Sequence, residues 1–232
     1  MENKDYSSNS PYVMDNLTQY PEELALLLSI ATAKEYTPGE HVYLQKEASR
    51  HRFFMIESGK IKISILRDDG SEKILAIQEK NTFFGEASAL DGHPYFATAT
   101  ALERTRVQII NVADFLRLAA KHPKAAFVIM ASLARMIRLL VMQIEDFSFL
   151  DAQKRVAHMV FKLLSEVGEK TAEGMIIRKK LTHEDLARLT SLSRVSVSLA
   201  LNKLEEQKIL RKKRYVIEVT DLERLKSVMG SK

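Results

Sequence analysis

LTHEDLARLTSLSRVSVSLALNKLEEQKIL, residues 181–210, contains two short helical patterns separated by a tight corner. Thr182 is a suitable N-cap for the first helix, with Asp185 three residues later as in a capping box. The corner falls at residues 191–193, and Ser193 is a suitable N-cap for the second helix. The apolar residues that would join the two helices are Leu186, Ala187 and Leu189 on the first and Val197, Leu201 and Leu204 on the second. The stretch therefore predicts a helix–turn–helix.

The outward side of the second helix is unusual at its amino-terminal end. It presents Arg194, Val195, Ser196 and Ser198, whereas exposed helix faces ordinarily carry Glu and Lys. Small side chains allow a helix end to approach the floor of a DNA major groove. An arginine there reaches a phosphate or a guanine edge, and a valine meets a thymine methyl group. This composition favours a helix that reads double-stranded DNA.

The residues that follow strengthen this interpretation. The segment ILRKKRYVIEV, residues 209–219, predicts a strand pair whose turn carries cations that would lie over phosphates, as in a wing. Residues 176–232 hold 14 Lys and Arg against 7 Asp and Glu, so this part carries +7 while residues 1–175 carry −2 of the net +5. A basic segment of this kind indicates a polyanionic partner. The residues predicted to contact DNA are Thr182, His183, Ser193, Arg194, Val195, Ser196, Ser198, Leu199, Lys203, Lys212, Lys213 and Arg214.

A long helical pattern covers residues 124–147 and carries an apolar stripe. The stripe recurs at steps of three and four residues, at Phe127, Met130, Ala134, Ile137, Val141 and Ile144. A helix of this length spans roughly 35 Å at 1.5 Å per residue, more than a small neighbouring domain needs. We therefore predict a second helix against the stripe, and hence a homodimer. Burial of the stripe against the chain's own core is the alternative.

The first half of the chain has the pattern of a β-rich domain. Residues 1–16 are polar and are expected to form a flexible arm, and residues 21–33 to form a helix. Residues 35–112 alternate short β-branched runs with turn signals, such as Asp-Asp-Gly at residues 68–70. Short strands at this spacing predict an antiparallel sandwich or barrel.

Composition excludes several classes of protein. The chain has no cysteine, which rules out disulfides, thiolate nucleophiles, Cys-held zinc and a cysteine-ligated iron–sulfur cluster. The first 16 residues lack the apolar core of a signal peptide. The longest apolar run, residues 137–144, is interrupted by Arg138 and Gln143 and is too short to span a membrane. A soluble, cytoplasmic protein with no membrane partner is therefore expected.

The order of these segments resembles the CRP/FNR (cyclic-AMP receptor protein/fumarate–nitrate regulator) family of bacterial transcription regulators, from about residue 17 to 226. The similar motifs are FFGEASALDGHPYFATATA at the position of the phosphate-binding cassette, IESGKIKI in a sandwich hairpin, Phe-Leu-Asp at residues 149–151, and the Ser-Arg pair that opens the second helix of the helix–turn–helix. Their order is more specific than any one of them.

The resemblance implies an α+β fold: an N-terminal antiparallel β-sandwich (a jelly roll like that of cyclic-nucleotide-binding domains), a long dimerisation helix, and a C-terminal winged helix–turn–helix. The implied limits are 1–16 for the arm, 17–122 for the effector-sensing domain, 123–149 for the dimerisation helix and hinge, and 150–232 for the DNA-binding domain. It also implies a homodimer and no enzymatic activity. Two recognition helices would enter successive major grooves about 34 Å apart, with RNA polymerase as a further partner.

The cassette departs from the cyclic-nucleotide branch of the family. That branch has an Arg-Ser pair where this chain has Tyr95 and Phe96, and it has hydroxyl side chains where the long helix has Leu140 and Val141. Glu86 remains where that branch binds the ribose. Losing charge-assisted bonds of about 1.5–3 kcal/mol each argues against cyclic AMP. The candidate effector residues are Gly85, Glu86, Ala87, Tyr95, Phe96, Ala97, Thr98, Ile137, Leu140 and Val141.

Several alternatives for the sandwich stay open. An aromatic, largely apolar pocket favours a small organic effector with an apolar body. Tyr95 and Phe96 could instead fill the pocket and make the regulator independent of any ligand. His41, His51 and His93 are candidate ligands for a haem that senses a gas. A cupin-like metal enzyme would need an H-x-H ligand pair, which the sequence lacks. A pure interaction module would not explain the basic terminal segment.

The recognition helix departs from the family as well. The family's usual pattern has Glu after the arginine and a second Arg four positions later, where this chain has Val195 and Leu199. Glu accepts from cytosine and Arg donates to guanine, so their loss favours an A·T-rich, two-fold symmetric site. Loose specificity, with affinity supplied by phosphates, is the alternative.

Overall fold

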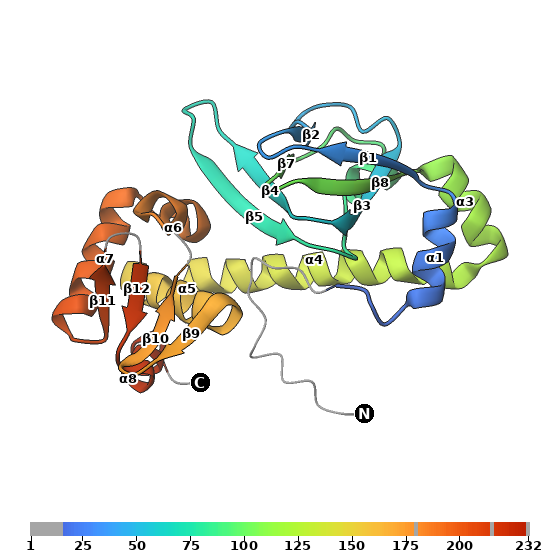
Figure 1. Cartoon of the computed structure of the whole chain (residues 1–232). Coiled ribbons are helices and arrows are strands. Elements are labelled where there is room, and N and C mark those ends of the chain that lie inside the picture. The colour runs from blue at the N-terminus through green and yellow to red at the C-terminus, as the bar shows by residue number, and fades with distance from the viewer. Residues whose placement is uncertain (1–15, 179–180, 214–215, 231–232) are drawn as a thin grey trace. The chain divides into compact units, whose positions relative to one another are not determined.

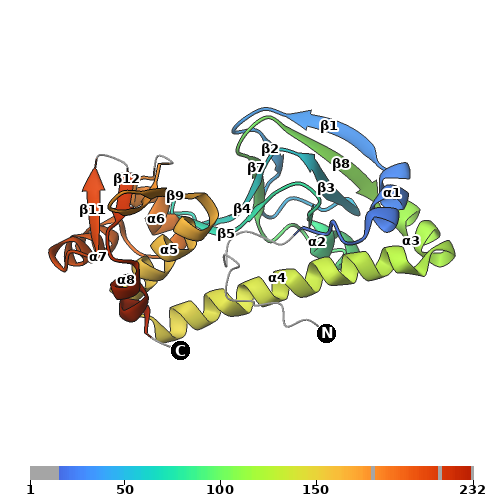
Figure 2. The ribbon, with the colours of Figure 1, turned by 60° about the horizontal axis from the view of Figure 1, so that its bottom comes forward.

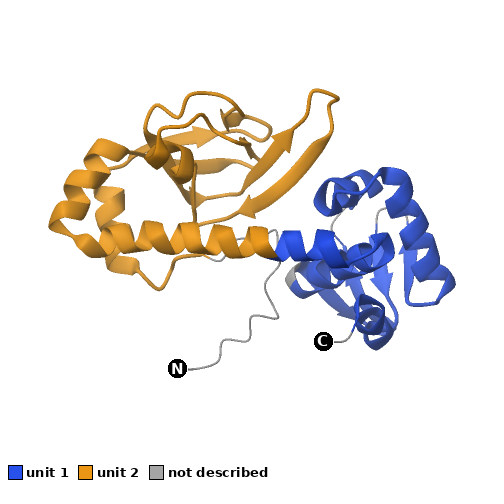
Figure 3. Cartoon of the chain, turned by 180° about the vertical axis from the view of Figure 1, so that it is seen from behind, with its two compact units in different colours: residues 1–10, 142–232 blue, residues 11–141 orange. Residues whose placement is uncertain are grey.

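The computed structural model describes residues 16–178, 181–213 and 216–230. Its contacts divide these residues into two compact units that meet between Val141 and Met142, inside one long helix (Figure 3). The amino-terminal unit is built on β-sheets, and the carboxyl-terminal unit combines helices with a small sheet (Figure 1).

The amino-terminal unit is an antiparallel β-sandwich. In the described chain its first sheet has the strand order β1-β8-β3-β6 and its second the order β2-β7-β4-β5. The strands of the first sheet are β1 (Thr32–Tyr36), β8 (Thr105–Asn111), β3 (Arg52–Ser58) and β6 (Phe83–Phe84). Those of the second are β2 (His41–Tyr43), β7 (Thr98–Ala101), β4 (Ile61–Leu66) and β5 (Glu72–Gln78). Every pairing is antiparallel, so the predicted sandwich is confirmed.

Aromatic side chains fill the space between the two sheets. The Tyr43 ring lies 5.6 Å from the Phe54 ring and 6.0 Å from the Phe84 ring, and the last two stack at 5.1 Å. Because such residues bury large apolar areas, they dominate the stability of a small core. The turn at residues 68–70 joins β4 to β5 as predicted, with Gly70 donating to the Arg67 carbonyl at 2.9 Å.

Helices cover the other face of the first sheet. Figure 2 shows α1 (Pro21–Ser29) and α3 (Val112–Lys121) together beside the first turns of α4 (Pro123–Phe149). Leu27, Phe53, Phe115 and Ile129 belong to the buried cluster beneath them. The helix predicted over residues 21–33 is too long by four residues. From Thr32 onward the chain pairs with β8 instead. The backbone N–H and C=O groups that a helix would have used form hydrogen bonds with this distant strand.

The long helix α4 has two apolar sides. Ala125, Val128, Ile129 and Leu139 are buried on one side. The predicted stripe lies on the opposite side and is exposed in the single chain, with Phe127, Met130, Ile137, Val141 and Ile144 each between 52% and 62% exposed. Burial of this stripe against the chain's own core is therefore ruled out.

The apolar length of α4 exceeds the short run counted in the sequence. Among the described helices, α4 alone is long and apolar enough to qualify as a candidate membrane span. A helix that packs inside a protein can be equally long and apolar, and Arg135 and Arg138 lie within α4.

The carboxyl-terminal unit surrounds α5 (Ala152–Val167), which Asp151 caps by accepting from the Lys154 N–H at 2.9 Å. Its sheet has the order β11-β12-β10-β9, and all its pairs are antiparallel. The elements are β9 (Gly168–Thr171), β10 (Gly174–Ile177), α6 (His183–Thr190), α7 (Arg194–Glu206), β11 (Leu210–Lys213), β12 (Val216–Val219) and α8 (Leu222–Met229). The sequence predicted α6, α7 and the β11–β12 pair, but not β9, β10 or α8.

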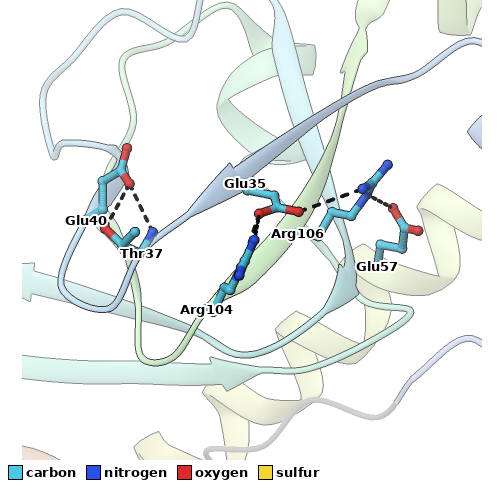
Figure 4. A network of polar contacts seen from close by, with 6 residues as sticks. All are labelled: Glu35, Thr37, Glu40, Glu57, Arg104 and Arg106. Carbon is cyan, nitrogen blue, oxygen red and sulfur yellow. Dashed lines mark hydrogen bonds and ion pairs between the residues drawn. The ribbon is translucent and has the colours of Figure 1, made fainter.

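Ion pairs link three neighbouring strands on the surface of the sandwich (Figure 4). Glu35 of β1 accepts from Arg104 at 2.6 Å and lies 3.8 Å from Arg106 of β8, which in turn contacts Glu57 of β3 at 2.9 Å. The hydrogen bond from Arg104, with its charge, lowers the pKa of Glu35. Exposed pairs of this kind contribute little stability individually, and they mainly fix side-chain order along the strands.

Glycine is required where β3 turns into β4. Gly59 has φ of +89°, and an added Cβ would meet the Arg104 carbonyl oxygen at 2.7 Å; Gly39 has φ of +86° with open space around it. We expect Gly39→Ala to cost about 1 kcal/mol for the backbone conformation alone. Gly59→Ala is expected to cost at least about 3 kcal/mol, because the neighbouring backbone must also move. Denaturant unfolding of both variants checks this, and equal losses would contradict it.

Candidate nucleic-acid interface and effector pocket

Hydroxyl caps set the two helices of the helix–turn–helix. The Thr182 Oγ1 accepts from the Asp185 N–H at 3.0 Å, and the Asp185 carboxylate accepts from the Thr182 N–H at 2.9 Å, which completes the predicted capping box. Ser191 has a left-handed φ of 54° at the corner. The Ser193 Oγ then accepts from the Ser196 N–H at 3.0 Å and starts α7. Both caps lie where the sequence predicted them.

Packing leaves one side of α7 uncovered at its amino-terminal half. Val197, Leu201 and Leu204 are buried against the rest of the unit, as predicted. On the opposite side, Val195 is 68% exposed and Leu199 is 64% exposed. Two large apolar side chains one helical turn apart on an exposed face are uncommon on a surface without a partner.

Cations surround a hollow beside this face. A cavity of about 560 Å³ lies between the starts of α6 and α7 and the β11–β12 pair, and its lining includes Thr182, His183, Arg194 and Lys212. Burial, followed by the charges of Lys212 and Arg194, lowers the pKa of His183. Arg194 makes no ion pair with another described residue. The lining also includes Glu184, so Arg194 is the cation of this hollow that is best placed to meet an anion such as a phosphate.

The wing cations are paired with acidic side chains of the same unit. The Lys212 Nζ lies 3.0 Å from the Glu205 carboxylate and also donates to the Asn202 side chain, and the Lys212 N–H donates to Glu205 at 2.8 Å. Lys213 contacts Glu218 at 3.0 Å. Both lysines lie within β11 rather than at its turn, which corrects the predicted position. Arg214 lies outside the described residues.

The contacts of Glu205 and Asn202 were not foreseen from the sequence. No spacing rule connects the last turns of a helix with the strand that follows it, so only the folded unit shows these contacts. Ser193, Ser196, Ser198 and Lys203 lie on α7 or at its start, as predicted.

The sandwich contains a small cavity at the start of α2 (Glu86–Asp91). Its volume is about 30 Å³, which is room for about one water molecule. The structure brings four of the predicted effector residues to its wall, and the remaining lining side chains were not predicted. The predicted ones are Gly85, Glu86, Ala87 and Phe96, and the others are Tyr43, Ile63, Gln78, Phe84, Leu133 and Met136.

Tyr95 is a core residue rather than a cavity-lining one. It is only 4% exposed, and its ring stacks on Tyr43 at 3.7 Å. Its hydroxyl donates to the carbonyls of Ser49 at 3.0 Å and Arg52 at 2.9 Å. Burial raises the pKa of Tyr95 to about 12. Phe96, its neighbour, is 52% exposed and lies at the cavity.

The other predicted effector residues lie away from this cavity. Ala97 and Thr98 are buried, and the Thr98 hydroxyl accepts from the Gln45 N–H at 3.0 Å. Leu140 packs against the sandwich core. Ile137 and Val141 belong to the exposed stripe of α4.

A buried carboxyl group connects the cavity to α4. Glu86 is 3% exposed, and its side chain accepts a hydrogen bond from the Ser132 hydroxyl at 3.1 Å. Burial raises the pKa of Glu86, although the Ser132 bond opposes that shift. None of the residues that line the cavity is Lys, Arg or His.

The histidines considered as haem or metal ligands lie in separate places. His41 contacts the Thr100 hydroxyl at 3.0 Å, and His93 lies beside Asp91 in a loop. His51 approaches the Ala89 carbonyl at 3.4 Å. Within residues 16–178, 181–213 and 216–230, no three or more His, Asp or Glu side chains gather as a metal would require.

Each of the two units matches a known protein family. The family model for the cyclic nucleotide-binding domain matches residues 33–122, and that for the Crp-like helix–turn–helix domain matches residues 154–228. A cyclic AMP receptor protein of Thermus thermophilus is 30% identical over 208 residues, which cover 90% of this chain and 93% of the relative. An anaerobic regulatory protein of Bacillus subtilis is 26% identical over 187 residues, or 80% of this chain and 78% of the relative.

Solved structures show the same architecture. A CRP-family transcriptional regulator of Thermus thermophilus matches with a TM-score of 0.68 and 25% identity, over 85% of this chain and 97% of that chain. A c-di-GMP-responsive global regulator of Xanthomonas campestris matches with a TM-score of 0.76 and 17% identity, over 86% and 98% of the two chains. At that identity the second match shows likeness of fold alone.

Tyr95 is buried and its neighbour Phe96 is half-exposed, so substitutions at the two positions should affect stability differently. Tyr95→Phe removes the hydroxyl donor from the Arg52 carbonyl and one of the two donors from the Ser49 carbonyl, and it is expected to lower the free energy of unfolding by about 1–3 kcal/mol. Phe96→Leu changes a half-exposed side chain and is expected to cost less than about 0.5 kcal/mol. Chemical denaturation measures both, and a larger loss for Phe96→Leu would mean that the two roles are reversed.

Proposed function

The chain belongs to the CRP/FNR family of transcription regulators, and on that premise we propose that it acts as a homodimer that reads a two-fold symmetric, A·T-rich DNA site under the control of a small effector other than cyclic AMP. Its cyclic nucleotide-binding and Crp-like helix–turn–helix domains make it a DNA-binding regulator and not an enzyme. The observation that carries the proposal is the uncovered amino-terminal half of α7, with Val195 and Leu199 exposed beside Arg194.

The chemistry of this face favours thymine. Methyl groups of Val195 and Leu199 would meet thymine methyls in the major groove, while Arg194 and the first-turn hydroxyls would contact phosphates or a base edge. The hollow beside it would hold a backbone phosphate against Thr182, His183 and Arg194. Each base contact of this type discriminates by about 1–3 kcal/mol.

The stripe on α4 supports the homodimer. Phe127, Ala134 and Val141 are spaced seven residues apart, as are Met130, Ile137 and Ile144, so the two sets form the alternating seam of a heptad repeat. A second copy would remove these exposed side chains from water. A two-fold dimer would then present two recognition helices to a two-fold symmetric DNA site.

The sandwich supports an effector other than cyclic AMP. Tyr95 fills space at the position where the cyclic-nucleotide branch has its phosphate-binding pair, and no cation lines the remaining cavity. A cyclic phosphate would therefore lose water without gaining a charge-assisted bond. A small organic molecule with an apolar body fits this wall better.

A ligand-independent regulator is the second candidate. It is favoured by the small size of the cavity and by the fixed hydrogen bonds of Tyr95. The functional limits that we propose remain 17–122 for sensing, 123–149 for dimerisation and the hinge, and 150–232 for DNA binding. The arm at residues 1–16 falls almost wholly outside the described residues. RNA polymerase as a partner and a location in the cytoplasm follow from the proposed role.

Changing the reading face tests the central proposal. Arg194→Ala removes a cation and Val195→Glu places a negative charge against the groove, so each is expected to weaken binding to promoter fragments by about tenfold or more. Glu206→Gln, at the far end of the same helix, is the matched control and should bind normally. Fluorescence anisotropy with A·T-rich duplexes measures all three. Wild-type affinity in both face variants would remove α7 as the reading helix.

Disrupting the stripe tests the homodimer. Ile137→Asp places a charge in the seam and should give monomers in sedimentation velocity. A monomer has one recognition helix instead of two, so its DNA binding should weaken on the order of a hundredfold. Ile137→Leu keeps the apolar contact and should remain dimeric. A dimer that persists in the Asp variant would exclude this face as the seam.

DNA binding should strengthen as pH falls. Burial and two neighbouring cations keep the pKa of free His183 below its usual value of about 6.5, so the ring is neutral at neutral pH. A bound phosphate would raise that pKa, so the complex takes up a proton and its affinity rises as pH falls through the bound-state value. His183→Gln should flatten the affinity profile between about pH 8 and about pH 6. An unchanged profile in this variant would place His183 away from the phosphates.

A further inference from the structure

We propose, on the basis of the effector site proposed above, that the ligand of the sandwich is a neutral or cationic hydrogen-bond donor with an apolar body, and that it takes the Glu86 carboxyl away from Ser132 of α4.

The charge of the cavity wall decides the class of ligand. The polar side chains of the lining are Tyr43, Gln78 and Glu86, and the rest of the wall is apolar. A carboxylate or phosphate ligand would leave water for a wall that holds an acidic group and no cation, which is unfavourable. A hydroxyl or an ammonium group would find an acceptor there.

The buried carboxyl group of Glu86 is hydrogen-bonded to its own backbone and to one neighbouring side chain. Its side-chain contact with a neighbouring side chain is the hydroxyl of Ser132, which is itself fully buried. Burial raises the pKa of Glu86, so the ionised form is costly as the site stands. An ammonium ligand would offset that cost by pairing with the carboxylate, and an alcohol would replace the Ser132 bond by an equivalent one.

The same exchange would transmit binding to the long helix. Ser132, Leu133 and Met136 lie within about one turn of α4, and the last two line the cavity. A ligand larger than one water requires Phe96 to swing outward and Met136 to change rotamer, which suits an exposed phenyl ring and a flexible thioether. Once Glu86 binds the ligand, Ser132 loses its bond to the sandwich, so this part of α4 is freed from one of its polar tethers.

Three probes with the same ring separate the ligand classes in the full-length protein: benzylamine, benzyl alcohol and benzoate. The readout is the ¹³C-methyl signal of Met136, assigned with Met136→Leu. The amine and the alcohol should shift this signal saturably at concentrations on the order of 10 mM, as expected for ligands of this size. Benzoate and cyclic AMP should leave it unchanged.

Variants then test the exchange itself. Ser132→Ala removes the competing donor and should tighten benzyl alcohol binding by about threefold or more. Ser148→Ala, an exposed serine on the same helix, should have no effect. Glu86→Gln should weaken benzylamine by about tenfold or more and benzyl alcohol much less.

The inference is overturned if benzoate binds as well as benzylamine, if none of the probes moves the Met136 signal, or if Ser132→Ala binds like the wild type. Anisotropy with an A·T-rich duplex on the same samples separates these outcomes from the proposed function. Retained DNA binding alongside a failed probe experiment would reject the ligand class and leave the regulator proposal standing.

Discussion

The structure depends on a single helix that is apolar on two opposite sides. One side of α4 completes the core beneath the first sheet of the sandwich, through residues such as Val128 and Ile129. The other side holds a heptad stripe that the single chain leaves in water. In the part of the chain that the structure describes, only the inner side is covered, and an exposed apolar surface of this extent is typical of a site that binds a partner. The same helix also carries Ser132, so the core, the proposed dimer seam and the cavity are all attached to one rigid element.

Local signals made much of this fold predictable from the sequence. Thr182 and Ser193 cap their helices where the sequence placed them, because a cap depends on a few neighbouring residues. The predicted end of α1 was wrong because the backbone from Thr32 onward pairs with β8, about seventy residues further along the chain. Strand β10 was missed for the same reason, since its partner β12 follows two intervening helices, and β9 pairs only with β10 in the described chain.

The candidate sites were less predictable than the fold. The sequence motif assigned both Tyr95 and Phe96 to the effector site. Side chains of neighbouring residues point in different directions, however, and of these two only Phe96 lines the cavity. Ile137 and Val141 were assigned both to the stripe and to the effector site. Helical periodicity already argues against that double role, since Ser132 and Met136 lie on the other side of the helix. The partners of Lys212 could not be predicted, because they depend on how the wing folds back on α7.

The paired wing has a consequence for how ionic strength would act on this regulator. A free lysine in solution attracts mobile anions, and DNA sheds condensed cations when a lysine neutralises a phosphate. Glu205 and Glu218 already occupy Lys212 and Lys213, so these carboxylates serve as tethered counterions. When a lysine contacts a phosphate, the phosphate would replace the glutamate as its negatively charged partner. The released glutamates would then repel the DNA backbone. The complex should consequently lose affinity less steeply with added salt than its count of wing cations suggests, with Arg194 and Lys203 as the main electrostatic contributors among the described Lys and Arg residues predicted to contact DNA.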